Sequence, residues 1–196
     1  MTPIVVDAFQ PSPPAARTLE WTQPSWWRPV WELREGEHVR VVLRRAHWYG
    51  SVLLADIEGA PWRCMRQGFF EVQMVRADSD QPEMSFRPYG WHGDEDTDRL
   101  RLSRLRGDGP IECADGRRWF WRQHGLIRDR YWEVLDEHDR PILTLRRRQR
   151  PFHIDGTVGV GAEVPLEDGL RAAVFGWYLL LRETAHRRHA AAAGAG

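Results

Sequence analysis

An almost uninterrupted apolar stretch near the C-terminus constrains this chain more than any other feature. Residues 170–181 read LRAAVFGWYLLL, and at helical spacing their apolar side chains fall on both faces. A helix that is apolar all round belongs in a protein core or a membrane. The unbroken apolar run, residues 172–181, would span roughly 15 Å, whereas a bilayer core takes about 30 Å. We therefore predict a core helix over 165–189, rather than a short membrane anchor. Its predicted core side chains are those of Leu170, Val174, Phe175, Trp177, Tyr178 and Leu181.

The two ends of this stretch carry the signals of one helix. Pro165 suits a first helical position, because its missing N–H would have no partner there. Acidic residues at 167–168 and basic residues at 187–188 complement the helix dipole. Gly169 and Gly176 weaken the helix, but they also allow it to pack closely against other elements.

The chain between residues 31 and 161 reads as a series of short strands. Apolar and polar residues alternate in segments such as 69–76, and turn signals around Gly36 and Gly116 separate neighbouring segments. The pattern gives about ten to twelve strands at spacings of roughly 8–12 residues, which is typical of an antiparallel sandwich or barrel.

Composition changes at both ends of this region. Prolines clustered at 11–14 interrupt regular structure near the start of the chain. We therefore predict a Pro-rich N-terminal arm (1–25), one domain (26–189) and an Ala/Gly tail (190–196) that is disordered.

The basic residues of this chain are all arginine. The 28 basic residues balance 28 acidic ones, so no net charge attracts the chain to nucleic acid, and we expect no nucleic-acid partner. The absence of lysine excludes Schiff-base and P-loop chemistry. Any anion site must use Arg, His or backbone N–H groups.

Cys64 and Cys113 are the only cysteines. Because we recognise no signal peptide, we expect free thiols in a reducing compartment and a cytoplasmic location. A single disulfide is the alternative.

The order of the expected elements resembles a known fold group. A closed barrel can surround an apolar helix on all sides, whereas an open sheet covers one face. The D-x-x-G/D-x-P hairpins at Asp56 and Asp136, the segment Trp119-Phe120-Trp121 and the helix at 170–181 carry the resemblance, which covers about residues 28–189. In this pattern the chain resembles the tubby C-terminal-like group, which includes tubby proteins, phospholipid scramblases and LURP-one-related proteins. The resemblance implies a closed antiparallel barrel of about twelve strands around a buried hydrophobic helix.

The resemblance also implies a membrane-related function. Tubby proteins bind phosphoinositides, and scramblases are linked to lipid movement and calcium. Because this chain has neither lysine nor a cysteine-rich segment, we transfer none of these families' functional residues to it.

A weak internal similarity appears at an offset of 80 residues. Asp56 aligns with Asp136, and Gly36 with Gly116. This similarity is a hint of two related halves.

The run at 146–150 is the densest basic segment. On a strand, Arg146, Arg148 and Arg150 would share one face, where guanidinium groups could bind a phosphate or an anionic lipid headgroup. The competing interpretation is a solvated, charged edge that discourages aggregation, and we favour it.

Three other features admit two interpretations each. Trp21, Trp26, Trp27 and Trp31 either pack on the domain, which we favour, or form an aromatic patch for a lipid interface or a partner. The acidic segment 94–98 places Asp at alternate positions but lacks the glycine of a calcium loop, so we predict a surface loop. The histidines of the sequence His186-Arg-Arg-His189 would bind a metal only weakly, and we predict that they complement the helix dipole instead.

We predict a non-enzymatic protein without a metal or cofactor. Its expected partner is an anionic phospholipid surface, which it binds peripherally, or another protein. The alternative is a small-ligand-binding or catalytic barrel with an open interior lined by Trp and Arg, which requires the helix to pack outside.

Overall fold

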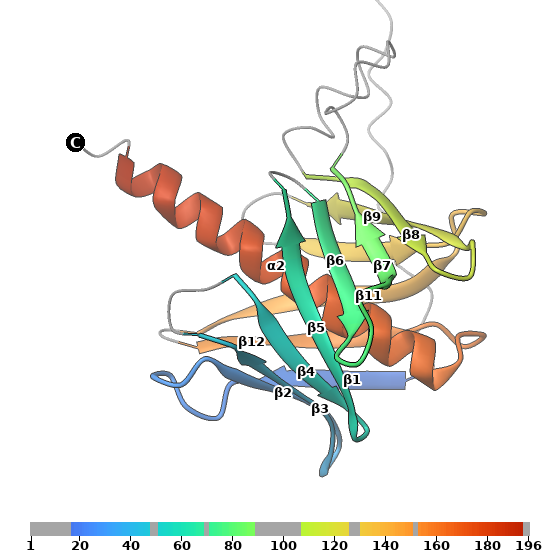
Figure 1. Ribbon diagram of the computed structural model, residues 1–196. Coiled ribbons are helices and arrows are strands. Elements are labelled where there is room, and N and C mark those ends of the chain that lie inside the picture. Colours follow the sequence, from blue (N-terminus) through green and yellow to red (C-terminus); the bar gives the residue numbers. More distant parts are fainter. Residues whose placement is uncertain are drawn as a thin grey trace, which may run out of the picture.

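The computed structural model describes residues 17–47, 51–68, 71–88, 107–125, 130–150 and 153–193 (Figure 1), with side chains described except at 149–150 and 186–193. Twelve strands and one helix lie in these ranges. They are β1 (Arg17–Thr22), β2 (Val30–Glu35), β3 (His38–Arg45), β4 (Leu53–Ile57), β5 (Ala60–Gln67), β6 (Glu71–Arg76), β7 (Pro82–Phe86), β8 (Gly109–Cys113), β9 (Arg118–His124), β10 (Tyr131–Leu135), β11 (Pro141–Arg150), β12 (His153–Val160) and α2 (Leu166–Ala193).

The strands form one closed antiparallel barrel. Each strand pairs with its neighbours in the sequence, and β1 also pairs with β12 to close the ring. The expected hairpins are present, including those with turns around Gly36 and Gly116, where positive φ angles suit glycine. Closure gives every strand two partners, which removes the exposed edges that favour aggregation. The predicted fold class is confirmed.

The barrel begins earlier than the predicted boundary at residue 26. β1 lies inside the segment 1–25, and it pairs with β12 and β2. Leu19 and Trp21 alternate with polar residues and are fully buried. The clustered prolines precede β1, so they do not interrupt its pairing.

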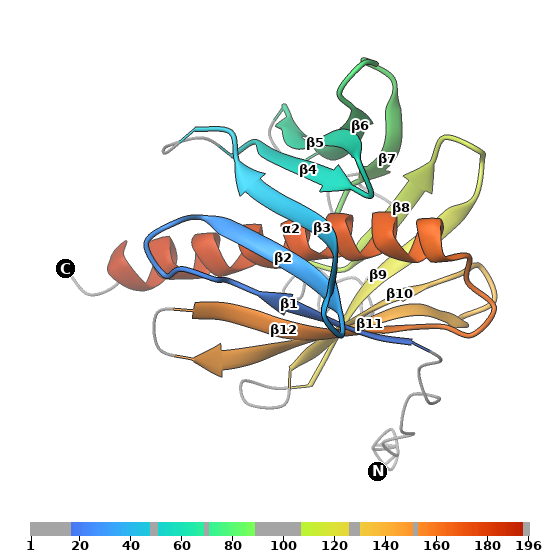
Figure 2. The ribbon, with the colours of Figure 1, turned by 90° about the horizontal axis from the view of Figure 1, so that it is seen from below.

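Helix α2 lies inside the barrel, with strands on opposite sides of it (Figure 2). Residues 172–180 are all buried. The Trp177 ring stacks on Trp21 of β1 with centroids 5.2 Å apart, and the Tyr178 hydroxyl donates to the Ser51 carbonyl, 2.8 Å away, just before β4. The predicted core helix is confirmed: its six predicted core residues are buried, except Leu181, which is half-buried. It begins at Leu166 and continues to Ala193, into the predicted tail.

Glycines permit the close contact between helix and wall. A Cβ atom on Gly156 of β12 would lie 2.8 Å from the Trp177 ring and 2.7 Å from the Arg146 carbonyl oxygen. A Cβ atom on Gly176 of α2 would lie 3.0 Å from Leu145 and from Trp121. Larger residues at either position would force the helix and the strands apart.

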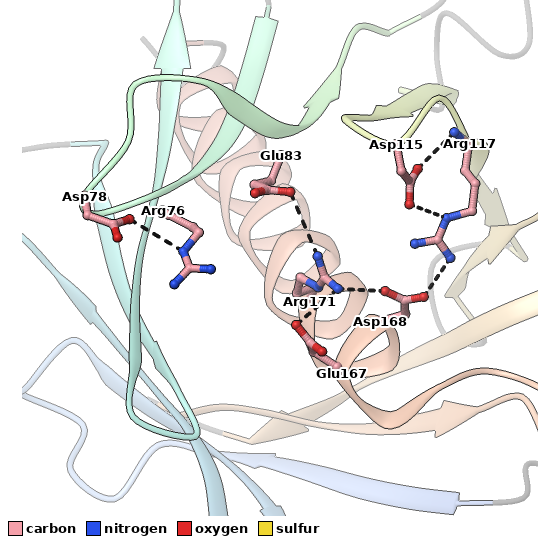
Figure 3. A network of polar contacts seen from close by, with 8 residues as sticks. All are labelled: Arg76, Asp78, Glu83, Asp115, Arg117, Glu167, Asp168 and Arg171. Carbon is pink, nitrogen blue, oxygen red and sulfur yellow. Dashed lines mark hydrogen bonds and ion pairs between the residues drawn. The ribbon is translucent and has the colours of Figure 1, made fainter.

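An ionic network fixes the first turn of α2 to the barrel (Figure 3). Asp168 is buried and accepts hydrogen bonds from Arg117, at 2.6 Å, and from Arg171, at 3.0 Å. Arg117 also contacts Asp115 in the β8–β9 turn, and Arg171 approaches Glu83 of β7 at 4.0 Å. Because several charges share these contacts, the network fixes the position of the helix along the barrel axis.

The two cysteines are free thiols, as expected. They lie on separate strands, and burial raises the pKa of the Cys64 thiol, and that of Cys113 to about 12. Among the described residues, no helix is long and apolar enough to cross a membrane.

Replacing Trp177 tests the position of the helix. We expect Trp177→Asp to abolish cooperative folding, because it places a charge without a partner in the core and removes the stack on Trp21. Trp27→Asp is the matched control, because Trp27 is exposed, and it should melt like the parent chain. Thermal unfolding followed by circular dichroism distinguishes the two, and a cooperatively folded Trp177→Asp variant would contradict the central helix.

Candidate functional site

The described residues at the two ends of the barrel differ in charge. In an up-and-down barrel, alternate connections lie at the same end, so the β2–β3, β4–β5, β6–β7, β8–β9, β10–β11 and β12–α2 connections share one end (Figure 2). Acidic residues dominate these connections and the strand termini beside them. They include Glu35, Glu37, Asp56, Glu58, Asp78, Asp80, Glu83, Asp115, Asp136, Glu137, Asp139, Glu163 and Glu167. We call this the acidic end.

Helix α2 leaves the barrel at the opposite end, which we call the basic end. Its described arginines are Arg28, Arg44, Arg45, Arg66, Arg87, Arg130, Arg146, Arg147, Arg148 and Arg182. Described acidic residues are fewer here, and some are already paired, such as Glu71, which lies 2.7 Å from Arg87. Among the described residues, carboxylates are therefore more frequent at the acidic end and arginines at the basic end, although several carboxylates at the acidic end are paired with arginines such as Arg40 and Arg140.

Two exposed tryptophans lie in the β1–β2 connection at the basic end. The side chains of Trp26 and Trp27 are 64% and 56% exposed. The Arg28 guanidinium lies over the Trp27 ring, 4.4 Å from its centroid. The Gln23 side-chain amide donates to the carbonyls of Ser25 and Arg28, which fixes the shape of this connection. The conformation of the loop therefore holds two large apolar groups toward the solvent.

The predicted tryptophan cluster thus divides into two pairs. Trp21 and Trp31 are buried in the barrel, as the packing interpretation expects. Trp26 and Trp27 are exposed, as the alternative interpretation of an aromatic surface patch requires. The loop lies beside the end of β3, because the Arg45 N–H donates to the Pro29 carbonyl at 3.2 Å.

The predicted anion site lies on β11, at the same end. Arg146 and Arg148 share the outer face, as the alternation predicted, and the side chain of Arg150 lies outside the described residues. Arg146 lies over the Tyr131 ring, 5.3 Å from its centroid, and Arg148 pairs with Glu20 at 3.0 Å. Within the predicted set, the charge of Arg148 is therefore already balanced by Glu20.

Other arginines belong to the inward-facing side of the wall. Arg45 of β3, Arg66 of β5 and Arg147 of β11 are in register with the buried residues of their strands and lie at the rim where α2 leaves; Arg45 and Arg66 are exposed there, and Arg147 is half-buried. Arg147 donates to the Thr184 hydroxyl of α2 at 3.3 Å. These three arginines could not be recognised as a group from the sequence, because only the closure of the barrel brings the ends of their strands around one helix.

Glu183 is the carboxylate that α2 itself contributes to this rim. It accepts a hydrogen bond from the Trp132 indole N–H at 3.0 Å and lies 3.7 Å from Arg130. Burial raises the pKa of Glu183 and outweighs the opposing effects of the indole and of Arg130. The helix is therefore attached to the wall by a carboxylate whose charged form is disfavoured.

The remaining candidates give no further site. Residues 94–98 and the side chains of His186 and His189 lie outside the described residues; the acidic segment belongs to the connection between β7 and β8. Within the described part of the chain, no three metal-ligating side chains gather.

Comparisons of the chain with protein-family models, with curated proteins and with solved structures gave no match. The functional argument therefore rests on the geometry of the basic end.

The raised pKa of Glu183 predicts a specific pH dependence. The folded state binds the Glu183 proton more tightly than the unfolded state, so this group stabilises the fold fully only below the ordinary carboxyl pKa of about 4.3. The stabilisation is lost as pH rises through the folded pKa. We expect the free energy of unfolding of the parent, relative to Glu183→Gln, to fall between pH 4 and pH 7.

Urea unfolding at several pH values measures this difference. Glu163→Gln is the control, because Glu163 is exposed and the same change of a carboxyl group to an amide is made there outside the core. A parent that gains stability over Glu183→Gln as pH rises would contradict the assignment.

Proposed function

We propose that this protein binds an anionic membrane surface through its basic end. The observation that carries the proposal is the exposed pair Trp26 and Trp27, held in a fixed loop beside arginines at that end. Indole rings favour the membrane–water interface, where their apolar body and polar N–H are both satisfied. Arginines close to an anionic leaflet contribute about 1 kcal/mol each.

The separation of charge supports one orientation on the membrane. An anionic surface attracts the basic end and repels the acidic end, so the barrel axis would stand upright with the basic end down. In this orientation α2 leaves the barrel toward the lipid (Figure 2). The predicted set Arg146, Arg148 and Arg150 belongs to the same end and is part of this proposal.

The resemblance to the tubby-like group agrees with a peripheral role at the cytoplasmic face of a membrane. The closed barrel around a helix is the architecture that this resemblance implies. Membership of the tubby-like group and the location at the cytoplasmic face of a membrane are both part of the proposal.

The position of α2 favours binding at the surface over binding in the interior. A ligand-binding or catalytic barrel would keep its interior open, and here the side chains of Phe175 and Trp177 fill the space between the described strands.

Co-sedimentation with vesicles tests the proposal. The full chain should bind phosphatidylserine-containing vesicles more than neutral phosphatidylcholine vesicles, and binding should weaken from low to physiological salt. Trp26→Ser combined with Trp27→Ser should lower the bound fraction several-fold. Arg28→Ser combined with Arg44→Ser should lower it further, by about fivefold per arginine if each contributes about 1 kcal/mol.

Arg118→Ser is the matched control, because Arg118 is an exposed arginine at the acidic end. Its binding should equal that of the parent. The variant with serine at Arg146, Arg148 and Arg150 tests the β11 set separately. Parent-like binding by the Trp26/Trp27 variant would reject the proposed surface, and absence of parent binding would redirect the search to a protein partner.

A further inference from the structure

Two arginines from different elements meet where α2 leaves the barrel. Arg66 follows the inward-facing Cys64 on β5 and lies at the rim. Arg182 lies one helical turn after Tyr178, on the same face of α2. The Tyr178 hydroxyl bonds to the Ser51 carbonyl beside β4, which is the neighbour of β5. The register thus directs Arg66 and Arg182 to one corner of the seam between helix and wall.

No acidic partner balances these two charges among the described residues. Neither Arg66 nor Arg182 has an ion pair or a side-chain hydrogen bond there, whereas Arg87, Arg130 and Arg148 at the same end each face a carboxylate. Two like charges therefore lie at the same rim, one exposed on β5 and one half-buried on α2.

The environment of Arg182 agrees with an incomplete site. Burial lowers the pKa of the Arg182 guanidinium, and repulsion from Arg66 lowers it further. Burial also raises the pKa of Tyr178 to about 12, so its hydroxyl stays neutral and remains bonded to Ser51. A half-buried guanidinium beside a second one is unfavourable until an anion joins them.

We propose that Arg66 and Arg182 together bind a phosphate-type dianion at the seam between α2 and β5. Arg45 lies in the same inward-facing set, because it pairs with Leu53, which pairs with Cys64, and it would be the third donor. Guanidinium groups bind phosphate oxygens in a bidentate manner. This site shares the basic end with the proposed membrane surface but does not depend on membrane binding.

The number of charges favours a phosphate monoester or free phosphate over singly charged anions. A monoester carries about −1.5 to −2 charges at pH 7 and balances both arginines. A phosphodiester or a carboxylate carries a single charge and leaves one guanidinium without a counter-charge. We therefore expect the site to bind phosphate monoesters and free phosphate more tightly than phosphodiesters or carboxylates.

Calorimetric titration and thermal unfolding with inorganic phosphate test the site without lipid. At matched ionic strength, phosphate should raise the melting temperature of the full chain more than chloride does. Arg66→Gln and Arg182→Gln should each weaken phosphate binding about tenfold or more, the loss expected for a charge-assisted hydrogen bond. Arg118→Gln is the matched control, because Arg118 is an exposed arginine at the acidic end, and it should keep the response.

A measurement without phosphate separates binding from folding. In phosphate-free buffer, Arg182→Gln should melt at the same temperature as the parent or higher, because it relieves the repulsion between Arg182 and Arg66. A phosphate effect no larger than that of chloride would overturn the proposal. So would an equal loss of the response in Arg118→Gln.

Vesicles distinguish the two sources of the phosphate group. If the ligand is a lipid headgroup, the parent should bind phosphatidic acid vesicles, which present a monoester, more than phosphatidylserine vesicles, and Arg182→Gln should lose this difference while it keeps binding to phosphatidylserine vesicles. If the ligand is free phosphate, Arg182→Gln should lose only the response to inorganic phosphate. Either result supports the site, and neither depends on the Trp26/Trp27 variant.

Discussion

Burial of α2 inside the barrel is the interaction on which the rest of the structure depends. Barrel diameter grows with strand number, and about eight strands already enclose a space that their own side chains fill. The ring of twelve strands needs additional material in its interior, and the apolar surface of α2 supplies it. The stack of Trp177 on Trp21 and the closely approached Gly156 show how tightly helix and wall fit.

Because the helix fills the interior of the barrel, we look for the binding surfaces at its two ends. The packed core contributes stability, whereas the charged side chains lie at the strand ends, on the outer faces and in the connections, one of which also carries both exposed indoles. The acidic end is tied to the first turn of the helix through Asp168, and the basic end surrounds its exit. One element therefore connects the two ends, which differ in charge and in the partners they can attract.

Local pattern was sufficient to predict most of the fold. All-round apolarity identified the helix, and turn residues identified the hairpins. The similarity at an offset of 80 residues now has a geometric counterpart: Gly36 and Gly116 occupy the β2–β3 and β8–β9 turns, six strands apart in the ring. β1 was assigned to the arm because a short strand between prolines shows only two inward positions, Leu19 and Trp21.

The candidate sites depend on information that a linear sequence does not contain. Acidic and basic residues are interspersed along the chain, and only the up-and-down topology shows which of them share an end of the barrel. Arg66 and Arg182 lie far apart in the sequence, and each looks like an ordinary charged residue until the register places the end of β5 next to the start of β4, which α2 contacts through Tyr178. By contrast, the run at 146–150 was predicted as an anion site because its arginines are close together in the sequence, although Arg148 is already paired with Glu20.

The order of elements also decides when this domain can be completed. The helix that fills the barrel follows all twelve strands in the chain, so the ribosome releases the entire wall before the core exists. The inward-facing Leu, Trp and Met residues must stay uncovered, or be shielded by chaperones, until residues 166–181 emerge. Premature termination just before α2 would therefore yield not a weakened barrel but a hollow, aggregation-prone one.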